Sequence, residues 1–478
     1  MQTKSIKYNF ILNNIRQVLN FLVPIVVFPY ISRILGPESL GKVEFANSIT
    51  SYFVLFTALG IPTYGVREIA RVRDDEKLRS KTVAELSLIL LITVFIGYVI
   101  YFIIIFFVPK FTTDILLFLI VAPTIFLSDF SYEWFFIGIE NQTYITFRYI
   151  LVKFIQIILI FLLIHNASQY YIYAAILIGM NGLSTIFNLF QLKKYVHFVS
   201  IKLLDVKKHF KPILTIFASL IATSVYMHID VTMVGTMVGD EAVGLYVVPN
   251  RVVRVVIHLI TSLGVVMIPR LENVLKKGDE EQYFSLLNKS LSFTLLFCIP
   301  SFFGIILTAP EVVYLFGGKS YTASILGMQL LSPILIFVPL AHFVGMQILY
   351  PYRKETKYTI SVTVASISNA IFNFFAIKKL QQNGAILGTV LAEGLGLILQ
   401  IIFAWDLLKK TELFSVNTIK IVFSAIIMFL SLTVFNKQFN LCNEIVSLIL
   451  KIVIAVFVYL LCLLIFREKT VKKIILKK

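Results

Sequence analysis

The chain of 478 residues is 58% hydrophobic and only 14% charged, which leaves too little polar surface to cover a soluble globule of this size. Its 43 Lys and Arg exceed its 26 Asp and Glu by 17, but the basic residues are spread along short connections between apolar stretches. This spacing is typical of a membrane insertion signal beside anionic lipid. The composition excludes a soluble globular protein, argues against a nucleic-acid partner, and predicts an all-α polytopic membrane protein.

Apolar stretches long enough to cross a membrane recur along the whole chain. A helix needs about 20 apolar residues to cross a hydrocarbon core of about 30 Å. The first stretch is interrupted by polar residues and no cleavage site follows it, so we expect it to remain as a span. Fourteen spans are predicted, at 9–33, 43–64, 83–108, 114–137, 148–166, 170–192, 211–237, 243–268, 288–308, 323–349, 359–377, 384–406, 418–436 and 445–466.

Basic residues gather in alternate connections, which predicts the topology. Of the 43 Lys and Arg, 31 fall on the side that holds both termini, 7 fall on the opposite side and 5 lie inside spans. Because Lys and Arg accumulate in cytoplasmic loops, both termini are predicted to be cytoplasmic. The connections 67–82, 193–210 and 269–287 are predicted to be solvated loops, and none is long enough for a soluble domain.

The chain repeats itself at an offset of 203 residues. Gly-Pro-Glu-Ser-Leu-Gly at 36–41 matches Gly-Asp-Glu-Ala-Val-Gly at 239–244, and Asn47 falls on Asn250. Six spans separate the copies, so both halves have one orientation, as in many secondary transporters. We therefore expect two pseudo-symmetric six-helix lobes with a cleft between them. The predicted parts are an N-lobe at 1–192, a cytoplasmic linker at 193–210, a C-lobe at 211–406, and a C-terminal helix pair with a basic tail at 407–478.

Polar side chains follow one face of two predicted spans. A charged side chain at the bilayer centre costs about 2.5–3.5 kcal/mol on insertion scales, so it marks a cavity or a partner. Spacings of three and four residues place side chains on one helical face. These stripes are Asn13, Arg16, Gln17 and Asn20 in the first span, and Asn250, Arg251, Arg254 and His258 in the eighth.

The repeat places the first, second, seventh and eighth spans in equivalent positions, so we expect their polar faces to meet across the cleft. Arg16, Arg251 and Arg254 are predicted to bind a phosphate-bearing anion, because a guanidinium group engages oxygens bidentately. The alternative is that an arginine pairs with Asp230 or Glu44 and holds the bundle together. The predicted polar lining, for parts of the substrate that need hydrogen bonds, comprises Asn13, Gln17, Asn20, Asn47, Tyr226, Asn250 and His258.

Several carboxylates also lie inside predicted spans. Glu44, Asp230 and Glu393 are candidates for binding a coupling proton or cation, or for lining the cavity. Asp129 and Glu133 lie one helical turn apart, and we expect them to meet interfacial water or basic side chains. The three cysteines, Cys298, Cys442 and Cys462, have no pairing or metal-ligand spacing, so neither a disulfide nor a metal site is expected.

Motifs at four places carry a resemblance to a known family. They are Ile-Ser-Arg-Ile-Leu-Gly-Pro-Glu-Ser-Leu-Gly at 31–41, Leu-Gly-Ile-Pro-Thr-Tyr-Gly-Val-Arg-Glu-Ile-Ala at 59–70, Glu-Trp-Phe-Phe-Ile-Gly-Ile-Glu at 133–140, and Asp-Val-Thr-Met-Val-Gly at 230–235, followed by Val-Gly-Leu-Tyr. They resemble the polysaccharide repeat-unit flippases of the O-antigen translocase (Wzx-type) family. The tryptophan motif is the most specific of the four.

The resemblance implies a MATE-like fold of the multidrug/oligosaccharidyl-lipid/polysaccharide (MOP) exporter superfamily with a central cationic cavity. It implies transport of an undecaprenyl-pyrophosphate-linked oligosaccharide from the inner to the outer leaflet of the bacterial cytoplasmic membrane. The transport would serve O-antigen, capsule or related polysaccharide synthesis, by alternating access coupled to H⁺ or Na⁺, with no other cofactor. Membrane lipids, a polymerase and other polysaccharide-assembly proteins are the implied partners.

Three alternative functions stay open at this point. A multidrug exporter of the same fold would be expected to have an acidic or aromatic cavity rather than arginines. A membrane glycosyltransferase or polymerase would need a sizeable soluble loop for its catalytic groups. A sugar transporter of the major facilitator type would carry a Gly- and Arg-rich loop between its second and third spans, where this chain has Arg-Glu-Ile-Ala-Arg-Val-Arg-Asp at 67–74.

Overall fold

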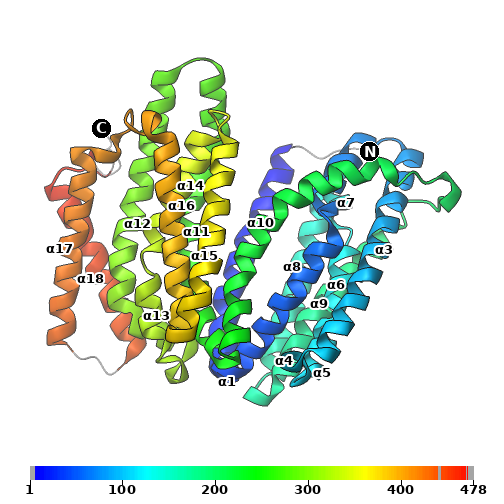
Figure 1. Cartoon of the computed structure of the whole chain (residues 1–478). Coiled ribbons are helices and arrows are strands. Elements are labelled where there is room, and N and C mark those ends of the chain that lie inside the picture. The colour runs from blue at the N-terminus through cyan, green and yellow to red at the C-terminus, as the bar shows by residue number, and fades with distance from the viewer. Residues whose placement is uncertain (1–5, 440–442, 470, 472–478) are drawn as a thin grey trace. The chain divides into compact units, whose positions relative to one another are not determined.

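The computed structural model describes residues 6–439, 443–469 and 471, and throughout these ranges the regular structure is helical (Figure 1). Contacts divide the chain into a first unit, Met1–Gly244, and a second unit, Leu245–Lys478. The first unit contains α1 (Ile6–Ala58), α2 (Ile61–Val72), α3 (Glu76–Phe107), α4 (Pro109–Thr112), α5 (Ile115–Val121), α6 (Pro123–Asp129), α7 (Glu133–Gly138), α8 (Gln142–Leu163), η1 (Ala167–Gln169), α9 (Tyr170–Leu192), η2 (Ile201–Leu203) and α10 (Lys207–Met237).

The helix α11 begins in the first unit and continues into the second. The second unit also contains the C-terminal helix pair, α17 and α18, which packs against α12. The bounds are α11 (Asp240–Lys276), α12 (Glu280–Gly317), η3 (Lys319–Tyr321), α13 (Ser324–Leu331), α14 (Ile334–Val344), the π-helical turn η4 (Gly345–Leu349), α15 (Glu355–Leu380), α16 (Gln382–Leu408), η5 (Glu412–Phe414), α17 (Val416–Gln438) and α18 (Glu444–Ile465).

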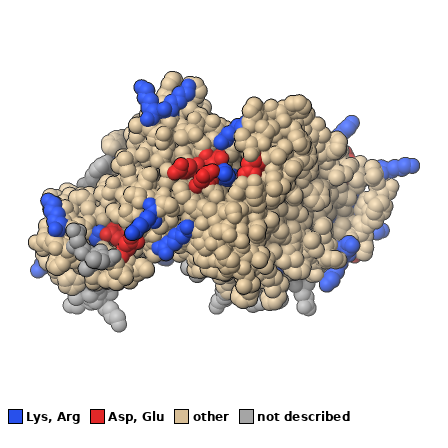
Figure 2. Space-filling model, turned by 90° about the horizontal axis from the view of Figure 1, so that it is seen from below, with Lys and Arg blue, Asp and Glu red and all other residues tan. Residues whose placement is uncertain are grey.

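The described residues form a multi-pass membrane protein. Twelve helical stretches are long and apolar enough to cross a membrane, or 13 if the two halves of α10, bent by 57°, make one span. The stretch Val18–Val72 contains two predicted spans, because α1 is interrupted only at Gly36. The prediction of about fourteen transmembrane helices is therefore confirmed. Charged side chains form small groups on the otherwise uncharged face seen in Figure 2.

Two connections predicted as loops are largely helical, so that prediction is wrong for them. Within 67–82, α2 continues to Val72 and α3 begins at Glu76; within 269–287, α11 continues to Lys276 and α12 begins at Glu280. Asp75 and Asp279 explain the early restart, because each carboxylate accepts a hydrogen bond from the backbone N–H three residues later. The helices therefore extend beyond the apolar stretches that the sequence marks.

The two copies of the repeated turn pack directly against each other within the first unit. A Cβ atom added to Gly41 would overlap the carbonyl oxygen of Asp240, and one added to Gly244 would overlap that of Pro37. Positions 41 and 244, like 37 and 240, are related by the offset of 203 residues. The contact is therefore self-complementary: each copy offers a glycine to the backbone of the other.

The repeat is also visible in the backbone itself. Gly36 has φ 72° and its equivalent Gly239 has φ 139°, values that residues with a side chain rarely adopt. Both copies thus turn the chain at the same position. The helix α10 packs on α1 in the first unit, whereas the predicted C-lobe begins at residue 211. Grouping by contacts does not test a duplication, so the predicted lobe boundaries stay predictions.

Glycines also let the motif at 59–70 and the tryptophan motif at 133–140 pack together. The ring of Trp134 in α7 lies where a Cβ atom of Gly65 in α2 would stand. In return, Gly138 of α7 lies against the side chain of Ile69 in α2. The two motifs are therefore the two sides of one helix crossing, which accounts for the small and large residues in them.

The end of the predicted linker is anchored to the first unit by the buried carboxylate of Glu85. This carboxylate accepts hydrogen bonds from the backbone N–H of Asp205 at 2.8 Å and from Lys208 at 2.7 Å, and it lies 2.9 Å from Nε2 of His209. The other ring nitrogen of His209 lies 2.7 Å from the Tyr64 hydroxyl. This network fixes the start of α10 on α2 and α3.

The helix α18 is held on α12 by an ion pair inside the second unit. Lys451 donates to the carboxylate of Glu311, and Ser447 donates to the same carboxylate oxygen at 3.0 Å. Lys451 and Glu311 are 8% and 12% exposed, so the pair is nearly buried. The predicted absence of a disulfide is confirmed for Cys298 and Cys462, which are free and buried, whereas Cys442 lies outside the described residues.

We predict that Gly41→Ala and Gly244→Ala each lower the thermal stability of the purified protein. The new methyl group must push two backbones apart, which costs typically about 1–3 kcal/mol when a packed site is overfilled. Melting temperatures in detergent provide the measurement. The control is Gly179→Ala in α9, where nothing lies within 4 Å of the added Cβ atom. Melting temperatures of the two variants equal to the control would contradict the tight contact.

Candidate substrate-binding site

The predicted polar stripe of the first span lies on α1. Arg16 donates to the amide oxygen of Asn13 at 3.2 Å, which confirms that these two side chains share a face. One turn further on, Asn20 accepts a hydrogen bond from the hydroxyl of Tyr149 in α8. The side chain of Gln17 lies outside the described residues. The stripe therefore meets α8 at Asn20.

Glu133 at the start of α7 holds two arginines. Its Oε1 atom accepts from Arg16 at 2.8 Å and its Oε2 atom accepts from Arg148 at 2.6 Å. The side chains of Arg16, Arg148 and Glu133 are 12%, 5% and 39% exposed. The prediction that Glu133 meets basic side chains is confirmed. Sequence reasoning missed Arg148 because it stands at the first residue of a predicted span and was counted with the preceding loop.

The other predicted site residues of the first unit lie on α1 and α10, which pack together. Asp230 is buried and interacts electrostatically with Tyr52, whereas Glu44 interacts with His228. Asn47 and Tyr226 are half-buried. These polar groups therefore lie on two helices that pack together.

The second polar stripe lies on α11 in the second unit. Nε of Arg254 donates to the amide oxygen of Asn250 at 2.9 Å, and the amide group of Asn250 donates to the Tyr246 hydroxyl at 3.3 Å. The predicted shared face of Asn250 and Arg254 is therefore confirmed. Arg251 is half-buried, and His258 is exposed and interacts with Arg254. The hydrogen bond that Arg254 donates to Asn250 fixes the direction of its guanidinium group.

The predicted site residues therefore fall in both units. Glu393 joins the second stripe in the second unit, where it is half-buried on α16 and interacts with Tyr358. The convergence of the two stripes on one cleft stays a prediction. The pairing of Arg254 with Asp230 or Glu44 also stays a prediction.

Asp129 departs from what the sequence predicts. It is 1% exposed, and it interacts with the side chains of Thr57 and Tyr98. The expectation that it meets interfacial water or a basic side chain is therefore wrong. The reason is that α6 ends at Asp129 inside the helix bundle, so the carboxyl group points into the protein and not to the membrane surface.

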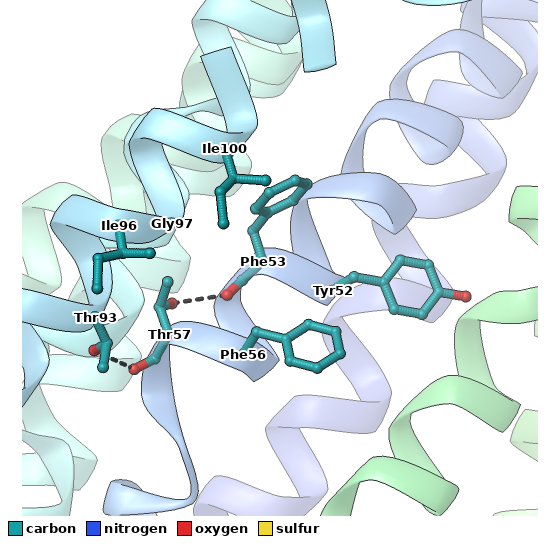
Figure 3. Close-up of a pocket in the computed structure, with 8 residues that line it drawn as sticks. All are labelled: Tyr52, Phe53, Phe56, Thr57, Thr93, Ile96, Gly97 and Ile100. Atoms are coloured by element: carbon teal, nitrogen blue, oxygen red, sulfur yellow. Dashed lines mark hydrogen bonds between the residues drawn. The ribbon is translucent and has the colours of Figure 1, made fainter. Parts of the chain in front are cut away.

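A cavity of about 360 Å³ lies between α1 and α3, with Thr57 in its wall (Figure 3). The hydroxyl of Thr57 donates to the backbone carbonyl of Phe53 at 2.8 Å, and the hydroxyl of Thr93 donates to the backbone carbonyl of Thr57 at 2.7 Å. Both hydroxyl protons are therefore bound to the backbone. Apart from the hydroxyl of Tyr52, which accepts a hydrogen bond from Thr232, the remaining lining is apolar, with Phe56 and Ile96 more than half exposed. This chemistry suits hydrocarbon and not a sugar.

A larger apolar groove of about 690 Å³ lies among α12, α17 and α18 of the second unit. Phe297, Gly304 and Tyr459 are among its lining residues, and Lys451 is the one charged side chain among the described residues that line it. Because Lys451 is paired with Glu311, the groove presents almost no free charge. Its chemistry suits an extended hydrocarbon chain.

The profile of a family described as polysaccharide biosynthesis protein matches residues 6–274, which is more than half of the chain. The chain belongs to the polysaccharide biosynthesis protein family. It is similar to a protein of Escherichia coli (strain K12) that is named as an O-antigen transporter, with 23% identity over 405 residues, covering 84% of this chain and 96% of the relative. It is also similar to the lipid II flippase MurJ of Bacillus subtilis (strain 168), with 26% identity over 170 residues that cover 35% of this chain and 30% of MurJ.

Solved structures show the same fold. The lipid II flippase MurJ in an inward closed conformation superposes with a TM-score of 0.74, at 20% identity, over 96% of this chain and 99% of MurJ. A multidrug resistance MATE family transporter of the MOP superfamily superposes with a TM-score of 0.63, at 17% identity, over 83% and 96% of the two chains. The predicted MATE-like fold and the resemblance to flippases of the MOP superfamily are confirmed.

We predict that Glu133→Gln destabilises the first unit. The neutral amide leaves Arg16 and Arg148 side by side without their shared carboxylate. Because Glu133 is partly exposed, we expect a cost at the lower end of the range for charged hydrogen bonds, about 1–2 kcal/mol. Thermal unfolding in detergent measures it. The double variant Glu133→Gln/Arg148→Gln removes one of the two cations and should regain part of the loss; no recovery would contradict a charge-based role.

Proposed function

We propose that this protein is a flippase that moves an undecaprenyl-pyrophosphate-linked oligosaccharide repeat unit from the inner to the outer leaflet of the bacterial cytoplasmic membrane. The movement would supply O-antigen, capsule or a related polysaccharide. The observation that carries the proposal is an arginine inside a membrane span, Arg254, whose guanidinium group is aimed by Asn250. The names of its relatives, an O-antigen transporter and a lipid II flippase, support the same class of substrate.

The substrate has three chemically distinct parts, and the protein has a matching group for each. Arg16, Arg251 and Arg254 would bind the pyrophosphate, because guanidinium groups pair with phosphate oxygens. The amide and hydroxyl side chains of the two stripes would bind sugar hydroxyls. The apolar groove of the second unit would hold part of the isoprenoid tail, because its side chains would make dispersion contacts with the hydrocarbon.

Alternating access is the proposed mechanism of movement. The fold that the chain shares with a MATE family transporter of the MOP superfamily supports it. Glu44, Asp230 and Glu393 are the proposed acids for coupling transport to H⁺ or Na⁺. Both termini would be cytoplasmic, and a polymerase and other polysaccharide-assembly proteins would be partners.

We predict that Arg254→Ala abolishes flipping while the protein still inserts and folds. The purified chain is reconstituted in liposomes with a labelled polyprenyl-pyrophosphate oligosaccharide, and the fraction that becomes accessible to an added glycan-modifying enzyme is measured with and without an ion gradient. Arg254→Lys should recover only part of the rate, because an ammonium group lacks the bidentate geometry. The control is Arg71→Ala. Arg71 is 64% exposed and pairs with Glu68 at the surface.

The same assay separates the proposed function from the alternative. Protein-dependent movement that is lost in Arg254→Ala supports the flippase. Normal movement in Arg254→Ala would contradict the role of this arginine. No movement with the wild type, together with uptake of cationic drugs, would instead support a multidrug exporter of the same fold.

We predict that Gly304→Leu slows flipping by occupying the groove. A Cβ atom at Gly304 meets nothing within 4 Å, so the larger side chain fits without disturbing α12 and projects into the space proposed for the tail. The control is Gly179→Leu, at an exposed helical position of α9 with similarly open surroundings. If both variants flip the substrate at a rate near that of the wild type, the groove has no role in transport.

A further inference from the structure

The charges at the contact of α1 and α8 do not balance. Among the described residues there, two cations, Arg16 and Arg148, bind the carboxylate of Glu133, and a third cation, Lys153, follows on α8. The polar partner of Lys153 is the neutral amide oxygen of Gln156, at 2.8 Å. The cluster therefore carries a net charge of about +2 inside a membrane-spanning bundle, where unbalanced charge is costly.

Tyr149 joins the three cations into one cluster. The Nζ atom of Lys153 lies 5.8 Å from the centre of the Tyr149 ring, and the Tyr149 hydroxyl interacts electrostatically with both Arg16 and Glu133. Lys153 stands one helical turn beyond Tyr149 on α8, and Tyr149 links it to Arg16 and Glu133. The cluster, which we call the α1–α8 cluster, consists of Arg16, Glu133, Arg148, Tyr149 and Lys153.

The two guanidinium groups keep hydrogen-bonding capacity for a further anion. Arg148 is 5% exposed and its Nε atom is buried without a hydrogen-bond partner, as is the Nε atom of Arg16. Glu133 occupies one terminal nitrogen of each arginine. The carboxylate thus holds the two guanidinium groups in place and leaves their Nε–H groups as donors for an oxygen atom of an incoming anion.

The depth of Lys153 distinguishes between a substrate and a membrane phospholipid as the source of that anion. Lys153 lies eleven residues after Gln142, the first residue of α8, which is about 16 Å along a helix of about 33 Å. A phospholipid headgroup stays at the end of the span. A phosphate group that is carried through the membrane passes its middle.

We propose that Arg148 and Lys153, together with Arg16, form a station for the diphosphate of a lipid-linked sugar on the first unit. A diphosphate diester carries two negative charges, which offset the net charge of the cluster, whereas a phosphodiester lipid carries one. The proposal rests on the proposed function and deepens it, because it assigns two further residues to the recognition of the diphosphate. Arg251 and Arg254 lie on the other unit and are not needed for this station.

Binding of undecaprenyl diphosphate to the full chain in nanodiscs of neutral lipid tests the proposal. Lys153→Gln should weaken the Kd about tenfold, and Lys153→Arg should restore it to within about threefold of the wild type. Phosphatidylglycerol should not compete at equal mole fraction. The control is Arg71→Gln, which removes a cation of the first unit that is 64% exposed and paired with Glu68 at the surface, and it should leave the Kd unchanged.

Three outcomes overturn the station. They are an unchanged Kd in Lys153→Gln, an equal loss in the control, and competition by phosphatidylglycerol as strong as by undecaprenyl diphosphate, which would identify a lipid-headgroup site. If Lys153→Gln fails to fold, Arg148→Lys in the same titration decides, with weakened binding expected. Flipping in liposomes separates the two proposals. If the wild type flips the substrate and the folded Lys153→Gln variant flips it at the same rate, the station alone is refuted. If the wild type does not flip the substrate, the proposed function is refuted.

Discussion

The first unit depends on places where two chain segments approach more closely than a side chain would allow. Gly41 and Gly244 let the two copies of the repeated turn meet backbone to backbone. Gly65 receives the ring of Trp134, and Gly235 of α10 receives the ring of Phe45 in α1. In a membrane the apolar surroundings give helices no hydrophobic reason to associate, so close packing at small residues supplies much of the attraction. The motifs that resemble the Wzx-type family are these contact points.

A second constraint is the cost of charge in hydrocarbon. Glu133, Glu85 and Glu311 each hold basic partners contributed by a different helix or by the segment that leads into α10, so each ion pair also ties elements together. A charged group that has no such pair is therefore unusual in this protein. The positive excess of the α1–α8 cluster is therefore informative, whereas Lys451, which has its own carboxylate, is explained by structure alone.

The apolar and polar surfaces of the protein fit an amphipathic cargo. The groove among α12, α17 and α18 is almost entirely apolar, whereas α1 and α11 carry lines of amides and guanidinium groups. A lipid-linked oligosaccharide has the same division between a hydrocarbon tail and a charged, hydroxyl-rich head. Arginines would repel a small cationic drug, so they favour the proposed flippase over a multidrug exporter.

The sequence by itself determined the class of protein, about fourteen spans, the internal repeat and which side chains share a helical face. These properties depend on local hydrophobicity and on the 3.6-residue period, so the spacing of Asn250 and Arg254 is enough to place them together. The ends of the helices were harder to predict from the sequence, because capping by Asp75 and Asp279 extends the helices beyond their apolar stretches. Only the tertiary structure decided that Glu133 pairs with Arg16, 117 residues away, that Asp129 is buried, and that Gly41 meets Asp240. Such contacts join segments distant in sequence, and they depend on how whole helices pack, which no local pattern encodes.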